Sequence, residues 1–187
     1  VPARDELAAV GHNLESMNES FSGLVGTIRN QAVHVAMAGE SLAASVLLSS
    51  TIKFAGSLSL QAKSEGPVSI LFGECTHDRQ VRGYARVADG AVAHALDELL
   101  SRGTLAITIT PAEGQRYQGI VPLDAPRLAG CLEHYFAQSE QLPTAILLAC
   151  DGEHAAGLLL QVLPGSVGTP AEHAGHWEHL QRLARTV

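Results

Sequence analysis

The segment Gly39-Glu40-Ser41-Leu42-Ala43 has the residue types of a hydrolase nucleophile turn, in which a serine stands between a strand and a helix. Such a serine needs a base and an orienting acid, which later βα loops hold in that architecture. The chain downstream is patterned as antiparallel hairpins instead, and a serine that caps the amino end of a helix explains the same letters. We therefore interpret Ser41 as an N-cap and keep a small serine hydrolase using Ser41 as an alternative function.

Cysteines and histidines form no familiar metal or redox motif in this sequence. Cys75, Cys131 and Cys150 are far apart and no C-x-x-C pair occurs, so we interpret them as reduced and mostly buried. His173, His176 and His179 have a spacing that spreads their rings over a helix surface, which favours a solvated helix over a metal site. No phosphate-binding glycine loop and no H-E-x-x-H motif occurs. We expect no metal and no cofactor in this chain.

Other side chains that could do chemistry have simpler explanations. Glu133 and Glu140 lie on one face of a predicted helix, where a solvated stripe is expected rather than acid–base catalysis. Lys53 closes an apolar segment and is interpreted as a capping lysine at a helix end. Tyr84 and Tyr117 lie beside arginines within strands, so we interpret them as cross-strand aromatics on a solvent-facing side.

The composition describes a chain that can bury its own core. Its 187 residues are 46% hydrophobic, and 12 Lys and Arg against 19 Asp and Glu give a net charge of -7. Nucleic acids and anionic membranes require a basic patch, so we expect neither as a partner. We find no apolar run near the roughly 20 residues that a membrane-spanning helix requires, and the charged start VPARDELAAV does not resemble a signal peptide. A cytoplasmic protein is expected.

Hydrophobic periodicity predicts an α+β fold built from antiparallel hairpins and meanders. Leu42–Phe54 has no clear polar face, which predicts a helix buried on several sides, and Val33–Met37 before it alternates as a strand does. Asp124 is the predicted N-cap of a later helix that ends before Pro143. Period-two alternation predicts strands over residues 57–63, 68–72, 80–87, 104–110, 116–121, 144–149 and 156–163, and further helices are expected over 4–16, 91–100 and 171–185.

Three ordered segments, 47–87, 103–124 and 132–149, resemble the redox-regulated 33-kilodalton heat-shock chaperone family. The most specific pieces are Thr51-Ile52-Lys53-Phe54, Thr108-Ile109-Thr110-Pro111 with Gly114-Gln115-Arg116-Tyr117-Gln118-Gly119, and Tyr135-Phe136 followed by Ser139-Glu140-Gln141-Leu142-Pro143-Thr144. The resemblance extends over residues 41–165. Residues 1–40 depart from it, because the Arg-Gly-Glu of the family's first strand is missing from Phe21–Val25.

The resemblance implies an ATP-independent holdase of the bacterial cytoplasm, which captures unfolding proteins under oxidative and heat stress and dimerises on activation. It implies that residues of about 41–54 form a helix packed between β-layers, within a chaperone core domain at residues 1–165. Residues 166–187 would then begin the family's linker. Family members continue into a small zinc module whose four cysteines form the redox switch. Since the family's zinc cysteines would lie beyond Val187, we expect no zinc ligand in this chain.

A holdase works by offering apolar surface to unfolded chains and makes or breaks no bond, so we expect no catalytic residue. We expect the client-binding surface on the apolar sides of the hairpin strands, although the core is the alternative place for each candidate. These candidates are Val68, Ile70, Phe72, Ile107, Ile109 and Ile120. A non-enzymatic assembly domain with a single defined partner is the third function class left open.

Overall fold

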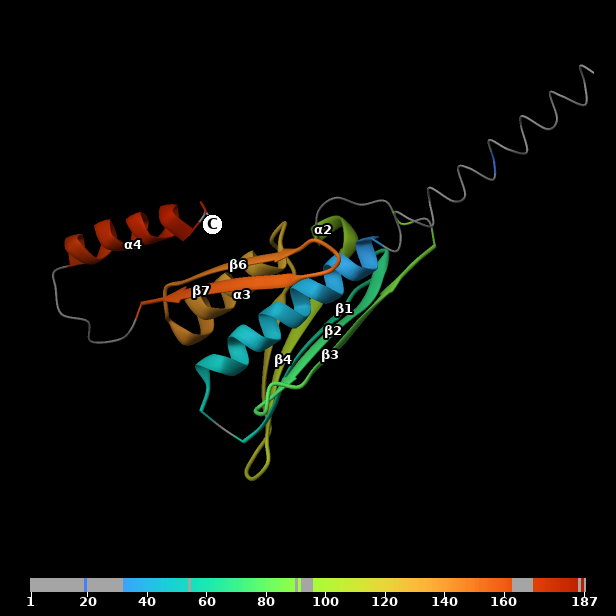
Figure 1. Ribbon diagram of the computed structural model, residues 1–187, viewed down its shortest axis with the longest axis horizontal. Helices are drawn as coiled ribbons and strands as arrows, with labels where there is room; N and C mark the ends of the chain where they lie inside the picture. Colours follow the sequence, from blue (N-terminus) through green and yellow to red (C-terminus); the bar gives the residue numbers. More distant parts are fainter. Residues whose placement is uncertain are drawn as a thin grey trace, which may run out of the picture.

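The computed structural model describes residues 19, 32–53, 55–89, 91, 96–162, 170–184 and 186. These residues form a five-stranded antiparallel sheet, a two-stranded hairpin and several helices, as Figure 1 shows. The predicted α+β class is confirmed. The helix predicted over residues 4–16 and the segment Phe21–Val25 lie outside the described residues.

The five-stranded sheet has the order β3-β2-β1-β4-β5, and every neighbouring pair is antiparallel. Strands β1 to β3 form the predicted meander, and the predicted β4–β5 hairpin is added on the other side of β1, which makes β1 the central strand. The strands are β1 Gly56–Lys63, β2 Val68–Thr76, β3 Val81–Val87, β4 Thr104–Pro111 and β5 Tyr117–Pro122.

A long helix, Ala32–Thr51, crosses one face of this sheet, and we call it the central helix (Figure 1). Its buried side chains include Met37, Ala44 and Leu48, so the prediction of a buried apolar helix is confirmed. The predicted bounds were wrong at both ends. The strand expected at Val33–Met37 is helical, and the helix stops at Thr51 rather than at Phe54.

The central helix lies between two β-layers. A hairpin of β6 Thr144–Cys150 and β7 Ala155–Gln161 covers the side away from the sheet. A side-chain carbon added at Gly157 of the hairpin would lie 2.6 Å from Leu47 Cδ1, and one added at Gly73 of the sheet would lie 2.5 Å from Ser41 Oγ. Both layers therefore touch the helix closely. Gly73 also meets the backbone of Ser41 and has no room for a side chain, whereas Gly157 meets the end of the Leu47 side chain.

By length and composition alone, the central helix could cross a membrane, which corrects our finding that no apolar run is long enough. Its apolar sequence is interrupted by Gly39, Glu40 and Ser41. Because of this interruption, the full length of the helix is not apparent from the sequence. The fold gives a reason for the apolar composition, because the helix contacts the sheet on one side and the hairpin on the other. A helix enclosed in this way needs apolar residues around most of its circumference.

Three further helices complete the described part of the chain: α2 Leu96–Leu99, α3 Leu128–Tyr135, which continues as the π-helix η1 Phe136–Glu140, and α4 Pro170–Ala184. The helix predicted over 91–100 is described as a helix only from Leu96. Asp124 is not the cap of α3, because the N-cap position is Arg127 and no side chain caps it. The Asp124 carboxylate lies 3.3 Å from His134 Nδ1 instead.

The core lies on the side of the sheet that faces the central helix, which we call the inner face. Leu58 and Leu60 of β1 are each 1% exposed, and Leu71 of β2, Leu105 of β4 and Val121 of β5 are buried with them. Leu128 and Leu132 of α3 close the same cluster. Alternate residues of each strand point to opposite sides of a sheet, so the register of this core also determines what lies on the other side.

Candidate functional site

The outer face, the side of the sheet away from the central helix, carries three transverse rows of side chains that the strand register aligns. Directly paired residues in antiparallel strands point to the same side. The middle row, which we call the apolar row, crosses all five strands as Tyr84, Phe72, Gln61, Ala106 and Ile120. On one side of it lie Arg82, Glu74, Ser59, Thr108 and Gln118, and on the other Arg86, Ile70, Lys63, Thr104 and Pro122.

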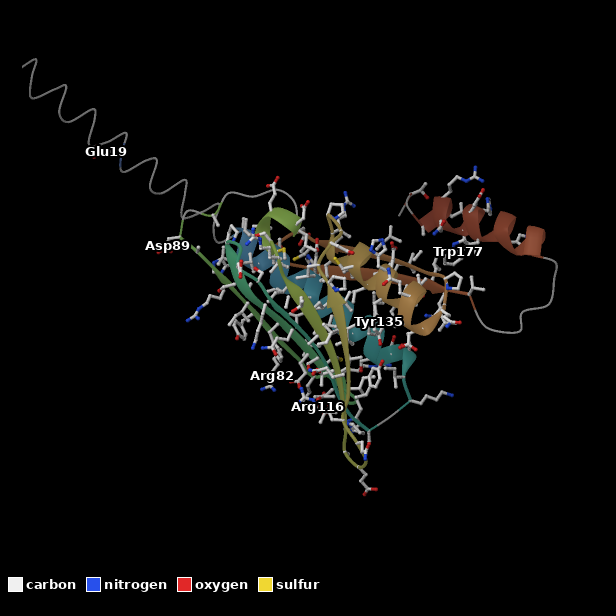
Figure 2. All side chains as sticks on the ribbon, turned by 180° about the vertical axis from the view of Figure 1, so that it is seen from behind. Glu19, Arg82, Asp89, Arg116, Tyr135 and Trp177 are labelled. Carbon is white, nitrogen blue, oxygen red and sulfur yellow. The ribbon has the colours of Figure 1, made fainter. Side chains whose placement is uncertain are left out.

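The apolar row is open to solvent among the described residues. The central helix, α3 and the hairpin all lie on the inner side of the sheet (Figure 1). Ile120 is 60% exposed and Tyr84 is 52% exposed, whereas Phe72 is only partly covered although its strand is not at an edge. In Figure 2, Arg82 projects from the outer face and Tyr135 lies on the opposite side of the sheet. The outer face thus presents a strip of apolar side chains, interrupted by Gln61, that the folded core does not use.

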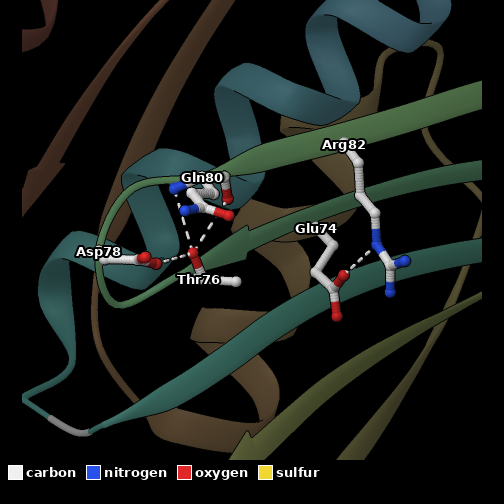
Figure 3. Close-up of polar contacts among 5 residues, drawn as sticks. All are labelled: Glu74, Thr76, Asp78, Gln80 and Arg82. Carbon is white, nitrogen blue, oxygen red and sulfur yellow. Dashed lines mark hydrogen bonds and ion pairs between the residues drawn. The ribbon is translucent and has the colours of Figure 1, made fainter.

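An aromatic pair and an ion pair organise one end of this strip. The Phe72 and Tyr84 ring centroids are 6.0 Å apart, and the Arg82 guanidinium carbon lies 5.9 Å from the Phe72 centroid. The same guanidinium donates through Nε to the carboxylate of Glu74 (Figure 3). Arg82 is therefore held by the Glu74 carboxylate and by the Phe72 ring over which it lies. These contacts also hold the Phe72 ring in place on the outer face.

The turn between β2 and β3 sets this geometry. The Thr76 hydroxyl donates to the Asp78 carboxylate, and the Gln80 N–H donates to Thr76 Oγ1 at 3.0 Å (Figure 3). The hydrogen bond from Thr76 lowers the pKa of Asp78 below its usual value, so the acceptor in this turn stays charged to a more acidic pH than a free aspartate. Because the turn fixes where β3 begins, it also fixes the pairing of Tyr84 with Phe72.

The six candidate residues divide between the two faces. Ile70, Phe72 and Ile120 lie on the outer face, with Phe72 and Ile120 in the apolar row itself. Val68 and Ile107 are buried core residues, 0% and 4% exposed. Ile109 pairs with Leu58 on the inner face and packs against the core.

Sequence reasoning did not find the row as a unit. Alternation indicates which residues of one strand share a face, but the row depends on β4 pairing with β1, which places Ala106 beside Gln61. Tyr84 was correctly interpreted as a cross-strand aromatic on the solvent side. The signal that could have found the row is the recurrence of one apolar residue at the centre of the outer-face pattern in β2, β3, β4 and β5, with Gln61 as the polar exception in β1.

Tyr117, Glu133 and Glu140 make contacts that our interpretation did not include, although Tyr117 is 48% exposed and Glu140 is exposed as expected. Tyr117 lies opposite Ile109 on the inner face, and its hydroxyl is 3.0 Å from that of Tyr135. The Tyr135 hydroxyl in turn donates to Glu140 Oε1 at 2.8 Å. Glu133 is not part of a solvated stripe either, because its Oε1 accepts the N–H of Ile146 on β6 at 2.7 Å.

Replacing Tyr135 with phenylalanine should lower the free energy of unfolding by about 1–2 kcal/mol, because two hydrogen bonds of the buried Tyr135 are lost. Burial first, and then hydrogen bonds to Tyr117 and Glu140, raise the pKa of Tyr135. A raised folded-state pKa stabilises the fold below the unfolded value of about 10, and this contribution is lost as pH rises further. Urea unfolding should therefore show a smaller difference in unfolding free energy between wild type and Tyr135→Phe above pH 10 than at neutral pH.

The matched control for this prediction is Tyr84→Phe, since that ring is exposed on the outer face. Its unfolding free energy should stay within about 0.5 kcal/mol of wild type, as for most surface changes. An advantage of wild type over Tyr135→Phe that is constant or grows with pH would contradict the assignment.

Ser41 lies inside the central helix, so both its N-cap interpretation and the nucleophile-turn geometry are wrong. It is 1% exposed and faces Gly73 of the sheet. Among the described residues its Oγ has no hydrogen-bond partner, neither a base nor any other group. Hydrolysis needs a serine that a substrate can reach beside a base, and Ser41 offers neither.

The three cysteines, His176 and His179 lie as their spacing indicated, and the side chain of His173 lies outside the described residues. Cys75 and Cys131 are free and buried, and Cys150 is free and partly buried near the Val35 carbonyl. His176 and His179 are exposed on α4. The parts of the chain that the structure describes hold no group of three His, Cys, Asp or Glu residues that could bind a metal ion. The three cysteines therefore do not fit a zinc site.

The comparisons with known proteins agree with this architecture. Residues 16–187 match the family described as Hsp33 protein. The chain is 44% identical over 183 residues to the 33 kDa chaperonin of Shewanella woodyi, covering 97% of this chain and 63% of that protein. It is 50% identical over 152 residues to the 33 kDa chaperonin of Pseudomonas paraeruginosa, covering 80% of this chain and 51% of that protein.

A solved structure shares the fold. The crystal structure of the 33 kDa chaperonin from Thermotoga maritima, described as a heat shock protein 33 homolog, superposes with a TM-score of 0.56 at 23% identity. The match covers 74% of this chain and 53% of that one. The chain spans less than two thirds of the length of these relatives. The extent of the family match and the identity to the curated chaperonins show that this chain belongs to the Hsp33 family.

Proposed function

We propose that this chain is the client-binding domain of an ATP-independent holdase chaperone of the bacterial cytoplasm. It binds unfolding proteins under oxidative and heat stress and prevents their aggregation. The observation that carries the proposal is the apolar row, which lies open on the outer face with Ile120 60% and Tyr84 52% exposed. The name 33 kDa chaperonin, which the curated relatives carry, supports a chaperone rather than an enzyme.

The physical basis is the transfer of apolar surface from water. An unfolding protein exposes apolar side chains, and the row offers a complementary strip at roughly 25 cal/mol per Å² of apolar area buried. The flanking rows are polar or charged except for Ile70 and Pro122, and the chain has a net charge of -7, so the holdase itself remains soluble. Binding of this kind makes no bond and needs no nucleotide.

Family membership motivates the further parts of the proposal. A zinc module outside this chain supplies the redox switch, and two copies associate as a dimer, which sedimentation of the isolated chain tests. Unfolding proteins are the partners, and nucleic acids and membranes are not. Within this chain the cysteines are free and two of them are buried, so a reductant has no disulfide to break. Its holdase activity is therefore independent of redox state.

The test is light scattering from a thermally unfolding client protein, with and without this chain. We expect the chain to suppress aggregation at near-stoichiometric amounts, equally in reductant and in oxidant. An equal mass of a monomeric protein without a contiguous exposed apolar patch serves as the control. Failure to suppress aggregation in both conditions would overturn the proposal, and strong inhibition by reductant would overturn its redox part.

A further inference from the structure

The outer face is locally cationic in an acidic protein. Its three rows carry the cations Lys63, Arg82 and Arg86 and a single carboxylate, Glu74. The chain as a whole has a net charge of -7. Glu74 is already paired with Arg82. The face that carries the apolar row thus has the opposite sign to the protein around it.

Two of these cations are available to a partner. Among the described residues, Lys63 and Arg86 take part in no ion pair, and both are exposed. They belong to the flanking row that also contains Ile70. Lys63 is on β1 and Arg86 is on β3, the two strands on either side of β2, which carries Ile70 and Phe72. Side chains two residues apart on a strand are about 7 Å apart, so a segment lying on Phe72 reaches both cations.

We infer that the outer face selects apolar client segments that carry acidic residues beside the apolar ones. This inference rests on the proposed function, since it names which unfolding segments that surface prefers. The apolar side chains of the client lie along the row, and its Asp and Glu side chains lie over Lys63 and Arg86. Segments flanked by Lys or Arg meet like charges there, which disfavours them.

The short range of charge interactions lets this local preference outweigh the net charge. At physiological salt the screening length is about 8 Å, so an acidic segment on the outer face responds to the adjacent Lys63 and Arg86. The nearby carboxylate of Glu65 is paired with Arg102, and carboxylates more than a screening length away are largely screened from the segment. Each exposed ion pair contributes modestly to the free energy of binding. Two such pairs, together with the repulsion that a segment flanked by Lys or Arg would meet, favour the acidic segment about tenfold.

The experiment uses two fluorescent peptides with identical apolar residues, one flanked by Glu and one by Lys. Fluorescence anisotropy with the full chain should show the Glu peptide binding about tenfold more tightly at 0.15 M salt. The ratio should fall towards one at about 1 M salt, where screening is nearly complete. The double variant Lys63→Glu/Arg86→Glu should reverse the preference.

The matched control is Lys53→Glu/Arg182→Glu, which makes the same change in net charge at exposed residues outside the three rows. It should keep the preference for the Glu peptide. Equal binding of both peptides to the wild type would overturn the inference and leave the holdase proposal standing. If neither peptide binds while aggregation is still suppressed, clients bind elsewhere and the inference falls with the assigned surface.

Discussion

The double variant Phe72→Gln/Ile120→Gln should lose most of the aggregation suppression while remaining folded. The two residues are the large aliphatic and aromatic anchors on opposite sides of the row's centre, and Ile120 is 60% exposed. Losing the burial of two such side chains costs a client about 2 kcal/mol or more. Half-suppression in the light-scattering assay should therefore require at least tenfold more chaperone.

The control for this variant is Leu180→Gln/Leu183→Gln, which removes two exposed leucines, 46% and 51% exposed, from α4. It should suppress aggregation as well as the wild type. Thermal unfolding checks that both variants are folded, since none of the four residues belongs to the buried core. Full activity of the Phe72 and Ile120 variant, or loss in the α4 variant, would move the client surface away from the outer face.

Replacing Gly73 with alanine should destabilise the whole domain. The added carbon would lie 2.5 Å from Ser41 Oγ and 2.7 Å from the Ser41 carbonyl oxygen. Because the second contact is to helix backbone, a side-chain rotation cannot relieve it, and the central helix must move away from the sheet. Overpacking of this kind costs about 1–3 kcal/mol, which for a domain of this size lowers Tm by about 3–10 °C.

Two companions separate the clash from other effects of adding a methyl group. Gly175→Ala in α4 meets nothing within 4 Å and should leave Tm unchanged or raise it. Adding Ser41→Ala to Gly73→Ala removes the hydroxyl but not the carbonyl, so the double variant should not recover. A Gly73→Ala protein that melts with the wild type would show that the helix has room to shift.

The strands could be predicted because local features of the sequence, such as alternation, a turn or a β-branched run, mark each of them. Residues 57–63 alternate polar with apolar, and the structure buries Leu58, Leu60 and Ala62 of that strand on the inner face. The turn at residues 64–67 and the β-branched run of residues 104–110 likewise gave the positions of β2 and β4 from local chemistry.

The start of the central helix could not be predicted in the same way. Val33, Val35 and Met37 are two residues apart, which is typical of a strand, yet in the helix Val33 and Met37 share the side that faces the core and Val35 lies on the opposite side. Only Met37 is buried and Val35 is 44% exposed, so tertiary contacts further along the segment decide its conformation. Period-two spacing over so few residues does not distinguish the two structures.

Three of the six candidate residues, Ile70, Phe72 and Ile120, lie on the outer face, and the other three do not, because contacts between distant segments decide this. The sequence identified apolar strand residues, but whether each lay in the core or outside depended on register and strand order. Phe72 and Ile120 share a row only because β4 returns to pair with β1. The roles of Glu133 and Tyr117 depend on contacts with β6 and α3, far away in the sequence, which no local pattern encodes.

The close contacts on opposite sides of the central helix have a mechanical consequence. Ser41 touches the sheet at Gly73 and Leu47 touches the hairpin at Gly157, so a rotation or shift of the helix would disturb its packing against both layers. The sheet, helix and hairpin must then melt together, as one cooperative unit. Heat that unfolds less stable proteins leaves the apolar row intact until this cooperative unit unfolds. The melting temperature of the domain therefore sets the highest temperature at which it can bind clients.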